Sequence, residues 1–171
     1  VTFNLQGGTH QIPATTFGNI GGASATNTVT FNGGGVALDT ISFASGNLIA
    51  LTFDAAQHIT FQNLTINAPG ADRPIWMYNG THHITFNHCD IIGGITTTSS
   101  LNSVIAITAT NASLAAVGDN ANFITITNCK IAGGYFGLTV YGTSTTDYVD
   151  NFVVTDNLFE DQYYYGVRFY Y

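Results

Sequence analysis

The sequence predicts an all-β protein, a right-handed parallel β-helix (a solenoid) of about six rungs, on the basis of three observations. A short strand-like motif returns every 25–40 residues. Most copies alternate apolar and polar residues, which is the period of a half-buried strand. Glycine, asparagine and serine separate the copies, and no window has the 3.6-residue period of an amphipathic helix.

The motif reads Val/Ile-Thr-Phe/Ile followed by a polar residue, and its copies begin 28, 30, 25, 40 and 29 residues apart. Its six copies are Val1–Asn4, Val29–Asn32, Ile59–Asn63, Ile84–His88, Ile124–Asn128 and Val153–Asn157. We expect Asn63, Asn128 and Asn157 to share one bend, because asparagine tolerates left-handed backbone. An antiparallel β-sandwich, the alternative fold, gives no reason for this shared position.

Two further short strands complete each regular rung. One follows the bend, as in Leu64–Ile66, and another precedes the next copy, as in Ile75–Met77. Stacking such rungs in register places equivalent side chains in columns about 4.8 Å apart. The side chains expected to point inward are Ile59, Phe61, Leu64, Ile84, Phe86, Cys89, Ile124, Ile126, Cys129, Val153 and Leu158.

The whole chain, 1–171, is interpreted as one β-helix segment of a larger protein. Residues 1–46 form less regular N-terminal rungs and 47–171 form regular rungs, with corner insertions at 93–102 and 109–122. Insertions of this kind either form binding surfaces or are simply tolerated. Both ends of the chain lie in strand-like runs, so we expect a segment truncated at both ends and flanked by further rungs.

The charge balance excludes two classes of partner. Three basic and ten acidic residues give a net charge of −7. Three cations cannot form the basic surface that nucleic acid or an anionic membrane requires. No apolar run approaches the ~20 residues of a membrane-spanning helix, so no membrane insertion is expected.

The basic and acidic residues do not predict a catalytic site. A polysaccharide lyase needs a Lys or Arg base, yet Lys130 occupies a regular rung position and no acidic cluster accompanies Arg73 or Arg168. Hydrolysis needs paired carboxylates. The close pairs, Asp147/Asp150 and Glu160/Asp161, lack the surroundings of known paired-Asp enzymes. We therefore expect no enzyme activity, no catalytic residue and no cofactor.

The histidines do not predict a metal site either. His82 or His83 together with His88 would need a third zinc ligand, for which Asp90 is the one nearby candidate. A bend-compatible polar residue explains His88 without a metal. His10 and His58 stand alone in the sequence.

The two cysteines, Cys89 and Cys129, occupy one inward position on successive rungs. The distance between rungs allows a disulfide, but parallel side-chain vectors favour a stack of two core thiols.

Threonine recurs at one outward position of the motif, in a file broken at Val154. Its members are Thr2, Thr30, Thr60, Thr85 and Thr125. Flat threonine arrays on solenoids can bind ice, although threonine is also a favourable outward strand residue.

Tyrosine is concentrated near the C-terminal end of the chain. Tyr163, Tyr164, Tyr165, Tyr170 and Tyr171 form the candidate interaction surface, with Tyr164 and Tyr170 expected to point outward. Such side chains favour protein interfaces and sugar stacking. The alternative is that they pack under a corner loop of a further rung.

Several stretches resemble the repeats of very large secreted β-helix proteins of the Bacteroidetes. They are Gly22–Phe31, Gln57–Ile66, Arg73–Ile75 and Gln162–Val167. The resemblance implies export by the type IX route and display at the cell surface or in extracellular fibres, often with adhesive roles. It implies no catalytic residues.

These observations together predict a non-enzymatic structural or adhesive shaft module of a large extracellular or cell-surface protein or fibre. Its expected partners are flanking rungs, further copies in a homo-oligomer or fibre, and cell-surface glycans. The alternative is a carbohydrate-binding or carbohydrate-cleaving β-helix, and a third hypothesis is ice binding.

Overall fold

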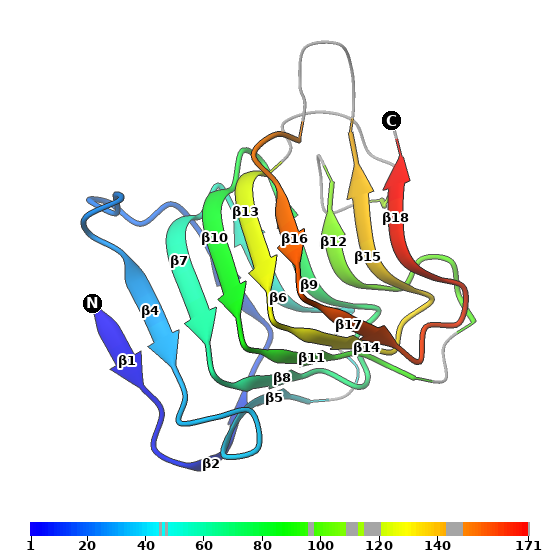
Figure 1. Ribbon diagram of the computed structural model, residues 1–171, viewed down its shortest axis with the longest axis horizontal. Helices are drawn as coiled ribbons and strands as arrows, with labels where there is room; N and C mark the ends of the chain where they lie inside the picture. Colours follow the sequence, from blue (N-terminus) through cyan, green and yellow to red (C-terminus); the bar gives the residue numbers. More distant parts are fainter. Residues whose placement is uncertain are drawn as a thin grey trace.

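The fold is a parallel β-solenoid of about five turns, in which three sheets enclose one core (Figure 1). The computed structural model describes residues 1–44, 46, 48–95, 98–108, 113–114, 121–142 and 149–170. These residues form strands and no helix, so none of their segments is a helix able to span a membrane. The predicted fold class is confirmed.

Each rung runs through sheets A, B and C in turn, and every pairing between rungs is parallel. Sheet A stacks β1 (Thr2–Asn4), β4 (Val29–Asn32), β7 (Gln57–Gln62), β10 (His82–Asn87), β13 (Asn122–Thr127) and β16 (Val153–Thr155). Sheet B stacks β2 (Gly8–Ile12), β5 (Asp39–Phe43), β8 (Thr65–Asn67), β11 (Asp90–Ile92), β14 (Lys130–Ala132) and β17 (Leu158–Glu160). Sheet C stacks β3 (Thr15–Phe17), β6 (Ile49–Asp54), β9 (Arg73–Tyr78), β12 (Ser103–Ile107), β15 (Phe136–Tyr141) and β18 (Tyr165–Tyr170).

The core consists of columns of like side chains, as the repeat predicted. In sheet A, Phe3, Phe31, Phe61 and Phe86 stack ring on ring, with centroids 5.3, 4.8 and 5.5 Å apart. The column continues through Ile126. Nine of the eleven expected inward residues are buried: Ile59, Phe61, Leu64, Ile84, Phe86, Cys89, Ile124, Ile126 and Cys129.

The prediction was wrong for Val153 and Leu158, because the last motif copy is shifted by one residue. Val153 pairs with outward Thr125 and is 44% exposed, whereas Val154 pairs with Ile126 and packs against the core. Val153, not Val154, therefore ends the threonine file. Leu158 pairs with outward Lys130 and is 54% exposed. A one-residue slip reverses the face of every side chain in a strand.

The bend after sheet A explains this shift. Asn63, His88 and Asn128 adopt left-handed backbone there, with φ of 56°, 51° and 53°. In the last rung Asp156 takes that conformation, with φ of 58°, in place of the expected Asn157. The amide of Asn157 instead accepts a hydrogen bond from Cys129 N–H and donates one to the carbonyl of Ile126.

The two cysteines are free thiols, as expected from their stacking. Both are buried, and the N–H of Cys89 lies 3.4 Å from the sulfur of Cys129. The pKa of Cys89 is raised well above its ordinary value by the hydrogen bond to Cys129 and by burial. The Cys89 thiol is therefore protonated at neutral pH and behaves as a core residue.

Leu114, in the corner insertion at 109–122, lies against sheet C. Leu114 packs with Trp76, Ala106 and Phe136 in a second apolar cluster. The indole N–H of Trp76 donates to the hydroxyl of Thr108 over 2.8 Å, and both side chains are fully buried. Leu114 therefore shields an apolar patch of sheet C from water.

We expect Phe86→Ala to lower the free energy of unfolding by about 3–5 kcal/mol, because it removes a fully buried ring from the aromatic column. Val153→Thr extends the outward threonine file and should change stability by less than about 0.5 kcal/mol. Urea unfolding followed by circular dichroism measures both values. Equal losses of stability in the two variants would contradict this register.

Candidate functional site on the outer face of sheet A

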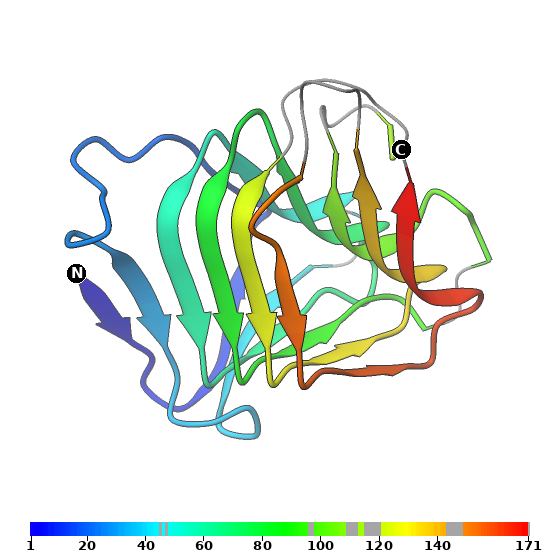
Figure 2. The ribbon, with the colours of Figure 1, turned by 45° about the horizontal axis from the view of Figure 1, so that its top comes forward.

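A shallow groove of about 470 Å³ runs across the outer face of sheet A. In Figure 2 the strands of this sheet run side by side as the downward arrows that include cyan β7 and orange β16. Two files of side chains line the groove. The threonine file contributes Thr60, Thr85 and Thr125, and the corner file consists of His58, His83, Phe123 and Asn151.

The corner file shares one backbone conformation. His58, His83, Phe123 and Asn151 have φ between 51° and 55°, in the left-handed region. Because the four rungs that contain β7, β10, β13 and β16 all bend at this position, the side chains project one above another. The ring of His83 stacks on the ring of His58 at 4.5 Å, and on the ring of Phe123 at 4.5 Å with an angle of 5° between the planes.

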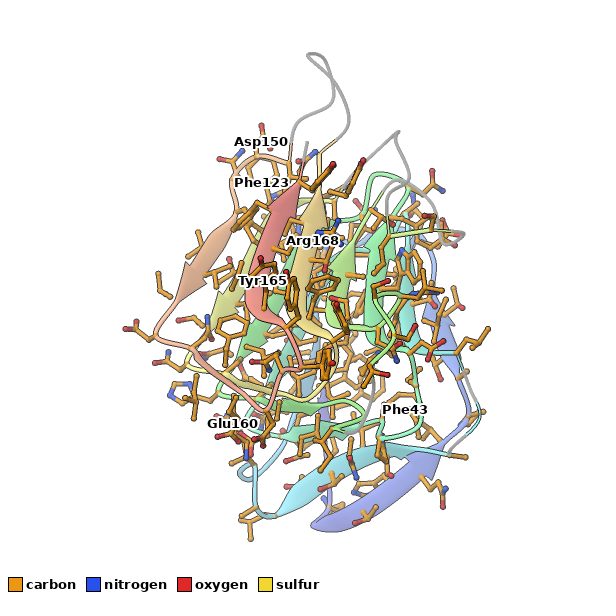
Figure 3. All side chains as sticks on the ribbon, turned by 90° about the vertical axis from the view of Figure 1, so that its right-hand side faces the viewer. Phe43, Phe123, Asp150, Glu160, Tyr165 and Arg168 are labelled. Atoms are coloured by element: carbon orange, nitrogen blue, oxygen red, sulfur yellow. The ribbon has the colours of Figure 1, made fainter. Side chains whose placement is uncertain are left out.

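Phe123 is the unusual member of the corner file. Asparagine and histidine enter left-handed backbone readily, but a bulky residue such as phenylalanine does so at a cost. Its side chain is nevertheless 44% exposed, near the end of the sheet where its N–H donates to the carbonyl of Asp150 (Figure 3). A strained, exposed ring in a groove is a typical feature of a ligand contact.

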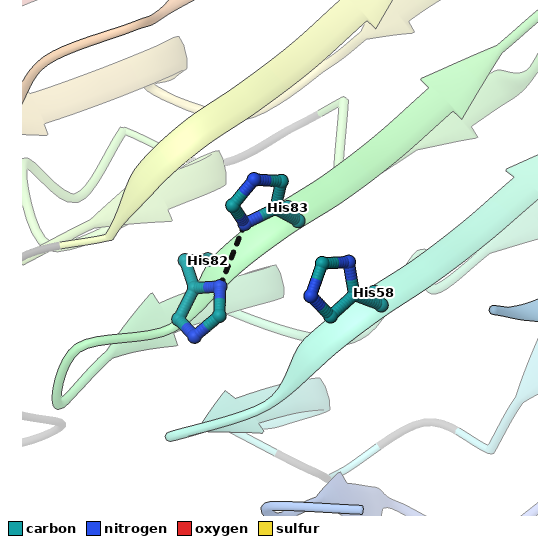
Figure 4. Close-up of side chains that lie close together, drawn as sticks. All are labelled: His58, His82 and His83. Atoms are coloured by element: carbon teal, nitrogen blue, oxygen red, sulfur yellow. Dashed lines mark hydrogen bonds between the residues drawn. The ribbon is translucent and has the colours of Figure 1, made fainter. Parts of the chain in front are cut away.

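His58, His82 and His83 form a three-histidine cluster at one end of this face (Figure 4). Nδ1 of His82 lies 2.7 Å from Nδ1 of His83, and one nitrogen of each of the three rings lies within 4.8 Å of the others. Two neighbouring residues of a strand normally point to opposite faces. The left-handed backbone of His83 breaks this alternation and brings its ring beside that of His82.

The structure corrects the expectation drawn for the histidines. His58, expected to stand alone, belongs to the cluster, whereas His88 hydrogen-bonds the side chain of Asn87 at the other end of β10. Asp90 pairs with Lys130 at 3.3 Å. The sequence contains a pattern that predicts the proximity of His58 and His83: the 25 residues between them equal the spacing of the two motif copies that follow them.

The environment of the cluster favours neutral imidazoles. The pKa values of His58, His82 and His83 are all lowered from the ordinary 6.5. Partial burial is the larger cause in each case, and the charge of a neighbouring histidine is the second. Neutral rings present free lone pairs at physiological pH.

The tyrosines form a second exposed surface, on the last described rung. Tyr163, Tyr164, Tyr165 and Tyr170 are 50–60% exposed, and Tyr171 lies outside the described residues. Rings of Tyr164 and Tyr165 lie 4.1 Å apart. We call these four tyrosines the aromatic surface.

Side chains of the previous rung support the aromatic surface. Tyr170 points outward and stacks on Tyr141 of β15, with centroids 5.0 Å apart. The guanidinium of Arg168 lies over the ring of Phe136 at 4.8 Å and over the ring of Tyr170 at 5.1 Å (Figure 3). The outward placement predicted for Tyr170 is confirmed.

The basic residues considered for catalysis make contacts within the fold. Lys130 lies between Asp90 at 3.3 Å and Glu160 at 3.6 Å, which joins three strands of sheet B. Arg73 is largely buried, donates to the carbonyl of Leu101 and covers the ring of Trp76 at 4.2 Å. Of the acidic pair, Asp147 lies outside the described residues and Asp150 is exposed.

Comparison with known proteins adds no relative: no protein-family model, no curated protein and no solved structure matches this chain. The geometry of the outer faces is therefore the basis for any functional assignment.

The histidine cluster should make stability depend on pH. Because its native pKa values are lowered, the unfolded chain binds more protons as the pH falls below 6.5, and folding becomes less favourable. The contribution is complete above that value and is lost on acidification. Urea unfolding at about pH 7.5 and about pH 5 should show a larger loss for the wild type than for the triple variant His58→Asn/His82→Gln/His83→Asn.

These replacements are residues that other rungs carry at the same positions: Asn151 in the corner file, and Gln57 in register with His82. The variant should therefore keep the fold. An identical pH dependence in the two proteins would contradict the lowered pKa values.

Proposed function

We propose that this chain is a non-enzymatic structural and adhesive shaft module. The observation that carries the proposal is the regular stacking: six strands follow one another in parallel register in each of the three sheets. Such a column transmits load along its axis through backbone hydrogen bonds, and each rung contacts only its neighbours. Repetition of this unit gives a stiff rod whose faces present repeating side chains.

Adhesion or self-association is proposed to use the aromatic surface. Its tyrosines combine rigid apolar area with a polar tip, which suits contact with protein or with sugar rings. The net charge of −7 comes from only thirteen charged residues, so most of the surface is uncharged and polar. Few like charges therefore repel one another when two shafts pack side by side.

The two end rungs suggest a second mode of contact. Phe3 and Phe169 occupy inward positions of the first and last rungs, yet they are 52% and 61% exposed. Exposed apolar side chains beside unpaired strand edges favour coverage by another strand layer. We propose that further rungs or another copy of the chain cover these faces.

The location proposed for the module is extracellular or at the cell surface. Its support is the resemblance of four stretches to large secreted β-helix proteins of the Bacteroidetes, which implies export by the type IX route. Charged residues make up only 8% of the chain, against about 25% in an average soluble domain. A surface of threonine, asparagine, serine and glycine is common among extracellular β proteins.

The second candidate function is carbohydrate binding in the groove of sheet A. One observation favours it: Phe123 exposes its ring in a strained conformation, stacked on His83 and beside the threonine file. Exposed aromatic faces stack on sugar rings, while threonine hydroxyls donate and accept hydrogen bonds.

The aromatic surface is tested by the double variant Tyr164→Ser/Tyr170→Ser in the intact protein. We expect smaller assemblies in sedimentation velocity and thinner fibres in electron micrographs, because the variant loses two exposed rings. Phe123→Asn, which removes an exposed ring from sheet A, is the matched control and should leave assembly unchanged. Unaltered fibre diameter and subunit number in the double variant would refute the proposed contact.

The groove is tested by glycan-array binding combined with a reducing-end assay. If the groove binds sugars, Phe123→Asn should abolish binding without loss of stability, because asparagine already occupies this left-handed position at Asn151. Tyr164→Ser/Tyr170→Ser should leave that binding intact. Release of reducing ends that is lost on changing Asp150 would instead show a carbohydrate-cleaving enzyme and exclude the non-enzymatic shaft.

A further inference from the structure

We propose that His58, His82 and His83 bind a divalent transition-metal ion of the zinc class on the outer face of sheet A. The three side chains come from the starts of two adjacent strands, β7 and β10 (Figure 4). One ring nitrogen from each lies within 4.8 Å of the other two. This inference is independent of the shaft function.

The distances fit a small ion with imidazole ligands. A tetrahedral site with Zn–N bonds of about 2.0–2.1 Å separates its ligand nitrogens by about 3.3 Å. The two Nδ1 atoms of His82 and His83 lie 2.7 Å apart, slightly closer than that, because they share a proton in a hydrogen bond. For a metal ion to replace this proton, the two rings must turn until both lone pairs point at one centre.

The third ligand is held by the fold. The ring of His58 stacks on that of His83 at 4.5 Å and meets that of His82 edge-on at 5.6 Å. The pairing of β7 with β10 fixes the relative height of the two strands. The paired strands hold the three side chains together before the ion arrives, and on binding the ring of His58 turns out of its stack on His83 so that its nitrogen points at the shared centre.

The donor set determines the class of ion. Three imidazole nitrogens suit Zn²⁺, Cu²⁺ and Ni²⁺, whereas Ca²⁺ and Mg²⁺ prefer oxygen ligands. The lowered pKa values keep the rings unprotonated near neutral pH, which reduces competition from protons. His83 is exposed, so a fourth ligand position is accessible to water or to a ligand in the groove.

Titration of the metal-free, untagged 171-residue chain with Zn²⁺ tests the site. Isothermal calorimetry should show one ion per chain, with micromolar or tighter affinity and no comparable binding of Mg²⁺. His82→Gln and His83→Asn should each weaken zinc binding at least about tenfold. Mutation of a residue that only hydrogen-bonds a metal ligand can already have an effect of this size. Lowering the pH should weaken binding as the imidazoles become protonated.

Two controls use substitutions of the same kind. His88→Asn introduces the residue that Asn63 and Asn128 already place at that bend, and it should leave zinc affinity unchanged. Phe123→Asn removes the ring stacked on His83 but no ligand, and it should retain one bound ion. Circular dichroism confirms that each variant is folded.

Three results would overturn the proposal. The first is the absence of any heat of zinc binding at concentrations up to about 1 mM. A dissociation constant above that value means weaker binding than ordinary specific association. The second is unchanged affinity in both cluster variants, and the third is an equal loss in His88→Asn. The histidine signals of the wild type in NMR spectra should broaden or shift for the three cluster residues and not for His10 or His88.

Discussion

The structure depends on one constraint, the parallel register that each rung imposes on the next. Every inward residue must fit above and below its counterparts, and in sheet A the column Phe3–Phe31–Phe61–Phe86 continues through Ile126 and Val154. The same constraint acts on the outer faces. It aligns threonines, amides and rings into files, and therefore makes a surface from residues far apart in sequence.

The register also explains which parts of the structure could be predicted. The motif and its spacing were sufficient to predict the fold class, the sheet A core and the left-handed bend at Asn63, His88 and Asn128. The last rung failed because Val153 and Val154 are both apolar, so alternation could not choose between them. Local interactions fix the register of the last rung. Asp156 forms the bend, and the amide of Asn157 takes the place of an inward apolar side chain and accepts a hydrogen bond from Cys129 N–H.

The histidine cluster was missed for a different physical reason. Alternation places His82 and His83 on opposite faces, and sequence distance separates both from His58. Left-handed backbone at His83 brings its ring to the same side as that of His82. Stacking of the rungs brings His58 beside His83 despite their distance in the sequence. Applying the 25-residue period to every polar residue, as well as to the motif, would have aligned His58 with His83. Joining His82 to them required the backbone angles.

The left-handed corner therefore has two consequences for this chain. It lets the chain turn into sheet A at the same place in successive rungs, a structural requirement that asparagine meets at a lower cost than most residues that carry a side chain. Its outward direction also makes it the position where side chains can vary without disturbing the core. Histidine at two rungs tolerates this backbone, whereas phenylalanine at the third adopts it at a cost, and the three rings stack at 4.5 Å. These rings add nothing to the core, so their benefit to the protein would come from contacts with a ligand or partner in the groove of sheet A.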